Sequence, residues 1–331
     1  MITSNTAALA TWVCSGLAMS IILSRLFVVR LYRLKMEPAD WLAMIGIAVI
    51  VTRLINDHYL LVDGTANDAI TGHLHNLSAA QLHQIKIGSI LALVARLLDT
   101  TFYWLSTATL LLFYSKLLHS VHWATIGIKC CWGLLAATYV AVVVVTLTEC
   151  RPFRLYWQVS PNPGHCTLAY LQLFLQGSCN ILLDLYILLV SFPLLHLAGR
   201  STGQKFRITI MACLGLFCII ITCIRIPLVV RGKSAQPART FFASIQILTS
   251  AFVANVPTIY GRLQNRRRRR AEQTLRRGSA PEMWWSSRST TRSDTTHGLH
   301  LANHFHCLDD KDARDSEAAD HHFAVTDRGI V

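Results

Sequence analysis

Seven stretches of apolar residues, each long enough to cross a lipid bilayer, constrain the fold of this chain more than any other feature. They cover residues 7–29, 41–62, 89–118, 125–147, 168–197, 208–230 and 241–261. A hydrocarbon core of about 30 Å needs roughly 20 mostly apolar residues in a helix. Only 15% of the 331 residues are charged, against about 25% in average soluble proteins. The sequence therefore predicts an all-α membrane protein, with a seven-transmembrane-helix bundle over residues 1–261 and a tail over residues 262–331.

Two of these stretches need a closer reading. The third has Lys86, Arg96 and Asp99 near or inside its start, so we expect its lipid-embedded part to begin near Leu98. The first lacks the basic flank of a cleaved signal peptide and is too long for one, so we expect it to remain as a span.

The lysines and arginines of the short loops predict the orientation. No cation precedes Arg25, whereas Arg30, Arg33 and Lys35 follow the first segment. The N-terminus is therefore expected outside or in a lumen, and the tail inside, in the plasma membrane or an endomembrane. One loop opposes this assignment, because it would place Arg231, Lys233 and Arg239 outside.

Two features of the outer loops agree with this orientation. Asn76-Leu77-Ser78 is an acceptor sequence for N-glycosylation. Cys150 and Cys166 lie in the next outer loop, where the secretory route is oxidising. A disulfide bond between them would close about 17 residues and contribute roughly 3 kcal/mol.

Polar side chains inside the apolar segments are the candidates for a binding site, because each is costly in a bilayer. Asn180 and Asp184 are four residues apart and share one face of the fifth segment. With Arg225 of the sixth segment they predict either of two arrangements. They form the floor of a cavity that binds a polar ligand, or Asp184 and Arg225 form an interhelical ion pair, the commoner arrangement in bundles. The other ionisable residues at this depth are Arg53, Asp57, Arg96 and Asp99.

Several function classes lose support. A retinal pigment needs a Schiff-base lysine, and residues 241–261 contain none, so we predict no retinal or other cofactor. The chain lacks paired membrane carboxylates and metal-ligand spacing within a segment, which argues against an enzyme without excluding one. The histidines of the second loop and of the tail are interpreted as solvated rather than as a metal site. No internal repeat favours a transporter.

The tail changes character along its length. Residues 262–292 contain ten arginines and two acids, and the remainder is acidic. We expect it to be disordered. Anionic lipids are the predicted partner of Arg266, Arg267, Arg268, Arg269 and Arg270, at about 1 kcal/mol per charge. A nucleic acid is not predicted, because membrane attachment explains this run.

Ser279 follows two arginines and a glycine and resembles a basophilic kinase site, whose phosphate would weaken lipid attraction.

Near the end of the seventh segment, Asn255 precedes Pro257 by two residues. A proline there is expected to kink the helix and free a carbonyl, which Asn255 could help to satisfy.

Several motifs, taken together, resemble the fungal rhodopsin-domain integral membrane proteins over roughly residues 20 to 262. They are Asp40-Trp41, Cys150-x-Pro152, Gly164-His165-Cys166, Asn180-x-x-x-Asp184, Leu214-Gly215-x-Phe217 and Arg225. This seven-helix family includes proteins of the satratoxin-cluster type and receptor-like proteins. The resemblance implies a non-enzymatic protein that is receptor-like or accessory to a secondary-metabolite pathway. A membrane-embedded transporter or enzyme acting on a pathway intermediate is the alternative.

The chain departs from this family at two positions that matter for a ligand. Thr107 stands where members commonly carry a lysine, and Gln246 where they carry an acid. Loss of a cation together with an anion indicates a lost buried pair, so a ligand shared with the family is not expected.

Overall fold

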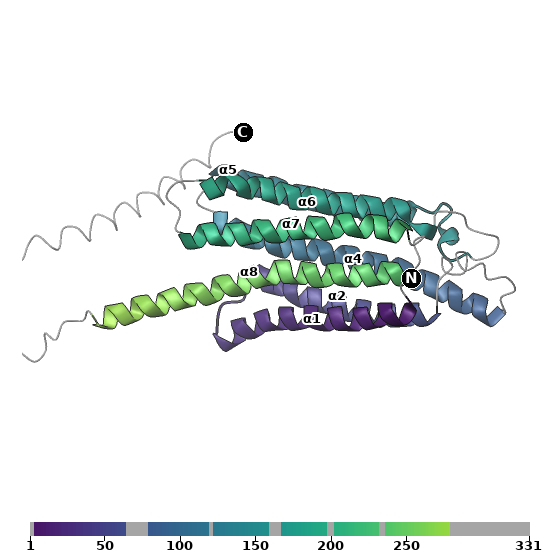
Figure 1. The fold of residues 1–331 in the computed structure, drawn as a ribbon, viewed down its shortest axis with the longest axis horizontal. Coiled ribbons are helices and arrows are strands. Elements are labelled where there is room, and N and C mark those ends of the chain that lie inside the picture. The colour runs from purple at the N-terminus through teal and green to yellow at the C-terminus, as the bar shows by residue number, and fades with distance from the viewer. Residues whose placement is uncertain are drawn as a thin grey trace, which may run out of the picture. The chain divides into compact units, whose positions relative to one another are not determined.

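The computed structural model describes residues 3–63, 79–118, 122–158, 167–196, 202–231 and 236–278. These residues form seven α-helices and one short 3-10 helix (Figure 1). The elements are α1 (Ser4–Leu31), α2 (Pro38–Asp63), α4 (Ala79–Leu118), α5 (His122–Thr148), η1 (Phe153–Trp157), α6 (Tyr170–His196), α7 (Thr202–Arg231) and α8 (Gln236–Gly278). Each α-helix coincides with one predicted apolar segment, so the all-helical prediction is confirmed.

Six of these seven helices are long and apolar enough to cross a membrane, and α4 falls short. α4 lies against α2 and α5, and its aromatic residues Phe102, Tyr103 and Trp104 are buried. A helix enclosed by other helices meets protein rather than lipid, so its polar groups can find partners there. The helix predicted over residues 89–118 is therefore present, but its composition alone does not identify a span.

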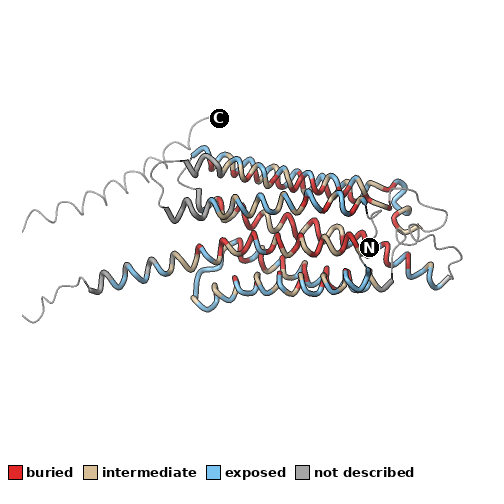
Figure 2. The backbone as a smooth tube through the Cα atoms, viewed as in Figure 1, coloured by how far each residue is buried: buried red, intermediate tan, exposed pale blue. Residues whose placement is uncertain are grey.

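The bundle has an apolar core, but it also exposes large apolar side chains and buries charged ones, which a soluble protein rarely does. Large apolar side chains such as Leu9, Phe27 and Leu189 lie on the surface, at 66%, 64% and 71% exposure. Charged side chains lie inside, with Arg25 at 0% and Arg53 at 1%. Figure 2 shows the buried residues on the helix faces that meet other helices. Apolar outer faces, with the charged groups turned inside, suit a lipid environment.

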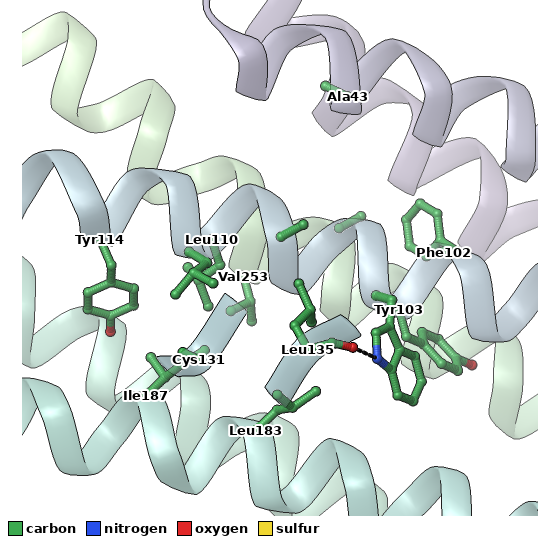
Figure 3. Close-up of a cluster of buried hydrophobic side chains, with 14 of the residues drawn as sticks. Ala43, Phe102, Tyr103, Leu110, Tyr114, Cys131, Leu135, Leu183, Ile187 and Val253 are labelled. Carbon is green, nitrogen blue, oxygen red and sulfur yellow. Dashed lines mark hydrogen bonds between the residues drawn. The ribbon is translucent and has the colours of Figure 1, made fainter. Parts of the chain in front are cut away.

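The apolar core brings α4 together with its neighbours (Figure 3). The indole Nε1 of Trp104 donates hydrogen bonds to the Leu135 carbonyl and to Thr138 Oγ1, each at 3.1 Å. Tyr186 OH on α6 donates to the Gly127 carbonyl on α5 at 3.1 Å. These bonds fix how α4 and α6 pack against α5.

A cluster of charged residues joins α1, α2 and α8 where α1 leads into α2. Arg25 and Asp40 are both fully buried, and their Nη2 and Oδ1 atoms are 3.0 Å apart. Arg25 Nη1 also donates to Asn255 Oδ1 at 3.1 Å. Asp40 Oδ2 lies 2.9 Å from Arg262 Nη2. Asn255 donates its amide to the Ala251 carbonyl at 2.8 Å, so it links α1 to α8 as well as bonding its own helix.

The last helix does not end at the predicted residue 261. α8 continues through the arginine run to Gly278, with Arg266 stacked 3.5 Å from the ring centroid of Tyr32. Arginine, glutamine, alanine and leucine are strong helix formers, and neither proline nor glycine interrupts residues 262–277. The predicted boundary between bundle and tail is therefore not a helix end. Residues 279–331 lie outside the described residues.

Candidate functional site

A pocket lies between α4, α6, α7 and α8, with about 450 Å³ of empty space that includes its opening to the surroundings. Asn180 and Asp184 line it from α6. The other polar residues on its wall include Thr107, Thr222, Gln246 and Thr249. The two positions at which the chain departs from the resembled family, Thr107 and Gln246, therefore face the same cavity.

The carboxyl group of Asp184 has no hydrogen-bond or ion-pair partner within the part of the chain that the structure describes. Asn180, one helical turn away, is 9% exposed and lines the same wall. Asp184 is thus a charged or hydrogen-bonding group open to whatever occupies the cavity.

Each threonine hydroxyl on the wall donates its hydrogen bond to a backbone carbonyl of its own helix. Thr107 donates to the Tyr103 carbonyl at 3.1 Å, Thr222 to the Cys218 carbonyl at 3.0 Å, and Thr249 to the Ile245 carbonyl at 2.9 Å. A hydroxyl has one proton and two lone pairs, so each of these groups can only accept a further hydrogen bond. We call this space the acceptor cavity, because its threonines and Asp184 all offer acceptors.

Arg225 does not join Asn180 and Asp184. Its Nη1 donates to Gln246 Oε1 and, at 3.5 Å, to Tyr103 OH, and its guanidinium carbon lies 5.9 Å from the Tyr103 ring centroid. Tyr103 and Gln246 line the acceptor cavity, whereas Arg225 lines a different one. The structure therefore brings together two of the three predicted residues, and no Asp184–Arg225 ion pair occurs in the described chain.

The second cavity has about 390 Å³ of empty space, which includes its opening, and lies where α6 and α8 begin. We call it the arginine cavity, because four arginines line it with two aspartates: Arg53, Arg96, Arg225, Arg239, Asp57 and Asp99. Sequence reasoning found five of these six as polar groups at membrane depth but did not bring them together.

Arg53 forms ion pairs with both aspartates of this cavity. Arg53 Nε lies 2.5 Å from Asp99 Oδ1, and its Nη2 lies 3.1 Å from Asp57 Oδ2. Arg96, although three residues from Asp99, instead donates to the Thr167 carbonyl at 3.2 Å.

Arg239 corrects the predicted loop between the last two segments. It lies on α8 rather than in a loop, is 7% exposed, and donates to the Leu168 and Ala169 carbonyls at 2.6 and 2.9 Å. Ala169 has φ of 47° just before α6, a conformation that is strained for a residue with a side chain. Arg239 thus secures the start of α6, and it is no evidence against the predicted orientation.

The remaining predicted sites lie at the edges of the described chain. Cys150 is buried and is not among the seven free cysteines of the described residues. Its expected partner Cys166, the glycosylation acceptor Asn76 and the kinase acceptor Ser279 lie outside those residues. The pairing, the glycan and the phosphate stay predictions. No group of three potential metal ligands occurs among the described residues.

A known protein family matches the part of the chain that forms both cavities. The family model described as the Fungal rhodopsin domain matches residues 24–264. No curated protein and no solved structure matches the chain. The family match includes the C-terminal end of α1 and every residue named in the two cavities, and it covers more than half of the sequence. The chain therefore belongs to the fungal rhodopsin domain family.

Proposed function

We propose that this protein is a receptor-like, seven-span membrane protein that binds a small organic ligand rich in hydrogen-bond donors. The observation that supports the proposal is Asp184, a carboxyl group without a protein partner in the described chain, on the wall of the acceptor cavity. A carboxyl group inside a bundle is costly unless another group pairs with it. An amine or a hydroxyl of the ligand would supply that partner.

The chemistry of the wall limits the ligand class. The three threonine hydroxyls and Asp184 offer acceptors to donor groups of a ligand. The amides of Asn180 and Gln246 on the same wall can donate, so they can also pair with an acceptor of that ligand. Amines and polyhydroxylated molecules carry N–H and O–H groups that can donate to the threonine hydroxyls and to the Asp184 carboxyl group. Leu110, Ile221 and Val253 line the same cavity and can contact a small apolar part of the ligand.

The ligand proposal is tested on the purified full chain by thermal unfolding with small primary amines, polyols and esters of similar size. We expect amines or polyols to raise the midpoint by roughly 5 to 10 °C at concentrations far above the Kd. Asp184→Asn should lose the amine effect. Tyr186→Phe is the matched control, because it removes a polar group two residues along α6 that bonds Gly127 instead of facing the acceptor cavity. Equal shifts with Asp184→Asn and the native chain would reject this site.

The membrane topology is part of the proposal. We infer that the N-terminus lies outside or in a lumen, that α4 crosses the membrane shielded by its neighbours, and that Cys150 and Cys166 are bridged. Protease added to intact cells should then spare a C-terminal tag. A non-reducing peptide map should contain the linked cysteine peptides, and free thiols at both positions would reject the bridge.

A receptor and an accessory pathway protein differ in what changes when the ligand site is lost. The gene in its natural host is replaced by the Asp184→Asn form, with Tyr186→Phe beside it, and both surface responses and metabolites are profiled. A receptor requires altered responses. Altered metabolites with intact responses would instead support a transporter, enzyme or accessory protein of the pathway.

A further inference from the structure

The arginine cavity carries more positive than negative charge. Four arginines and two aspartates line it, an excess of two cations. Glu149 is close enough to act electrostatically on Arg96 and Arg239, which reduces the excess to one. Both Glu149 oxygens, however, accept from backbone amides at the start of α6, Leu171 N at 3.0 Å and Gln172 N at 3.2 Å.

The two acids do not neutralise the other arginines, because both are bound to Arg53. Arg96 and Arg225 form no ion pair within 4 Å in the described parts of the chain. Their hydrogen bonds go to neutral oxygens, those of Thr167 for Arg96 and of Gln246 and Tyr103 for Arg225. Arg239 donates to the two carbonyls before α6. Buried guanidinium groups are normally matched by carboxylate or phosphate, which they bind in pairs of hydrogen bonds.

Three residues of this wall also carry buried donor atoms that have no hydrogen-bond partner among the residues that the structure describes. They are Arg53 Nη1, Arg225 Nε and Gln176 Nε2. Gln176 is 3% exposed, and its Oε1 accepts from Gln172 Nε2 at 2.5 Å. The oxygen of this amide is therefore occupied and its NH₂ group is available. Buried donors without acceptors are rare and costly, at about 1 to 3 kcal/mol each.

We propose that the arginine cavity binds a small oxyanion, the carboxylate or phosphate group of a second ligand. Two guanidinium groups without carboxylate partners, together with the Gln176 amide, supply the donors that such a group needs. The oxyanion neutralises the excess charge and satisfies the unpaired donors. This site is separate from the acceptor cavity, from which Tyr103, Gln246 and Arg225 divide it.

The test uses the purified full chain in uncharged detergent and follows its thermal unfolding midpoint. The probes are sodium acetate, inorganic phosphate and a short-chain phosphatidic acid, each compared with sodium chloride at equal ionic strength. A soluble oxyanion predicts that acetate or phosphate raises the midpoint by several degrees over chloride. A shift with phosphatidic acid alone assigns the oxyanion to a lipid headgroup and also supports the site. Equal midpoints with all four salts would overturn the proposal.

Two variants of Gln176 assign the effect to this cavity. Gln176→Glu places a carboxylate beside the guanidinium groups, so the midpoint without added oxyanion should rise and the oxyanion shift should disappear. Gln176→Leu removes the unpaired NH₂ but also the acceptor of Gln172 Nε2, so the midpoint without oxyanion should change little while the oxyanion shift falls several-fold. An undiminished shift with Gln176→Leu would contradict the site.

Asp184→Asn separates this proposal from that of the acceptor cavity. It should keep the oxyanion shift and lose the amine effect, while Gln176→Glu should do the reverse. A loss of both effects in either variant would mean that the two cavities are one site, against both assignments.

Discussion

Asp184 and Arg225 face different cavities, although each is a polar group deep in the bundle on neighbouring helices. The Arg225 guanidinium bonds Gln246 and Tyr103, and the Asp184 carboxyl group stays open to the acceptor cavity. A neutral glutamine has thus taken the place beside Arg225 that a carboxylate would fill. Asp184 is therefore an acceptor for a ligand in the acceptor cavity, and Arg225 is a cation for a ligand in the arginine cavity.

The first prediction concerns the coupling of these two residues. Asp184→Asn, Arg225→Gln and the double variant form a double-mutant cycle. Because no ion pair joins them in the described chain, we expect a coupling energy below about 0.5 kcal/mol, as for independent sites. Unfolding midpoints without ligand measure it, and a coupling of 2 kcal/mol or more would restore the ion-pair interpretation. Asp184→Asn alone should not destabilise the ligand-free protein, whereas breaking a buried pair costs about 3 to 5 kcal/mol.

The positions of the helices could be predicted from the sequence, but the sets of residues that meet inside the bundle could not. All seven helices coincide with predicted apolar segments, and length and apolarity identify six of them as long and apolar enough to cross a membrane. In such helices the lipid-facing and protein-facing sides are both apolar, so periodicity does not say which face meets which neighbour. Asn180 and Asp184 were found together because they share one helix face. The contact between Gln246 and Arg225 depends on how α7 packs against α8, and residue spacing within one segment does not predict that packing.

Two arginines show a second reason for missed contacts. Arg25 and Arg239 lie near segment ends, where a cation is normally a flank that marks orientation. The structure buries both, one against Asp40 and one against the carbonyls before α6. Their roles follow from partners far away in the sequence.

The second prediction tests the Arg25–Asp40 pair as a clamp between α1 and α2. Asp40→Asn removes the acid from a fully buried pair and also weakens the contact with Arg262. We expect a loss of about 3 kcal/mol or more in unfolding free energy, because Arg25 is left buried without its counter-charge. Lys116→Ala is the matched control. It removes a pair with Glu37 whose side chains are 53% and 36% exposed, and such pairs contribute at most about 1 kcal/mol. Equal losses would contradict the clamp.

The third prediction is a pH dependence that arises at Glu37, between α1 and α2. Partial burial acts to raise the pKa of Glu37, but hydrogen bonds from Lys116 and Arg262 outweigh it and hold the pKa below its usual value of 4.5. A depressed pKa in the folded state means that the stabilisation is complete above the unfolded value and is lost as the pH falls through the folded value. The midpoint difference between the native chain and Glu37→Gln should therefore be constant near neutral pH and shrink below about pH 4.5. A difference that grows on acidification would show that Glu37 is not held by these cations.

The fourth prediction concerns the indole of Trp104. Trp104→Phe keeps an aromatic ring but removes the donor to the Leu135 carbonyl and Thr138 Oγ1. Both atoms also take part in bonds within α5, since Thr138 Oγ1 donates to the Leu134 and Leu135 carbonyls. The expected loss is therefore moderate, about 1 to 3 kcal/mol, from the smaller ring and one lost bond between α4 and α5. Thr107→Val, which removes only a bond within α4, should cost less.

The last prediction ranks three glycine-to-alanine substitutions by what the added methyl group meets. Alanine favours a helix over glycine by up to about 1 kcal/mol. At Gly133 no atom lies within 4 Å of the added Cβ, so Gly133→Ala should raise the unfolding midpoint. At Gly177 the Cβ would lie 2.7 Å from Ile226 Cδ1, the far end of a side chain that can turn away, and 3.3 Å from Ile226 Cγ1, which is held more firmly. At Gly127 it would lie 3.1 and 3.4 Å from the two methyl groups of Val190.

Valine has one strongly preferred rotamer in a helix, so the backbones of α5 and α6 must separate to admit the Gly127 methyl group. That separation also lengthens the bond from Tyr186 to the Gly127 carbonyl. Gly127→Ala is therefore expected to be the most destabilising of the three, although the closest contact occurs at Gly177. Thermal midpoints of the three variants in one detergent measure the order. If Gly177→Ala were the worst, distance alone would govern the packing of these helices, and the stiffness of Val190 would not.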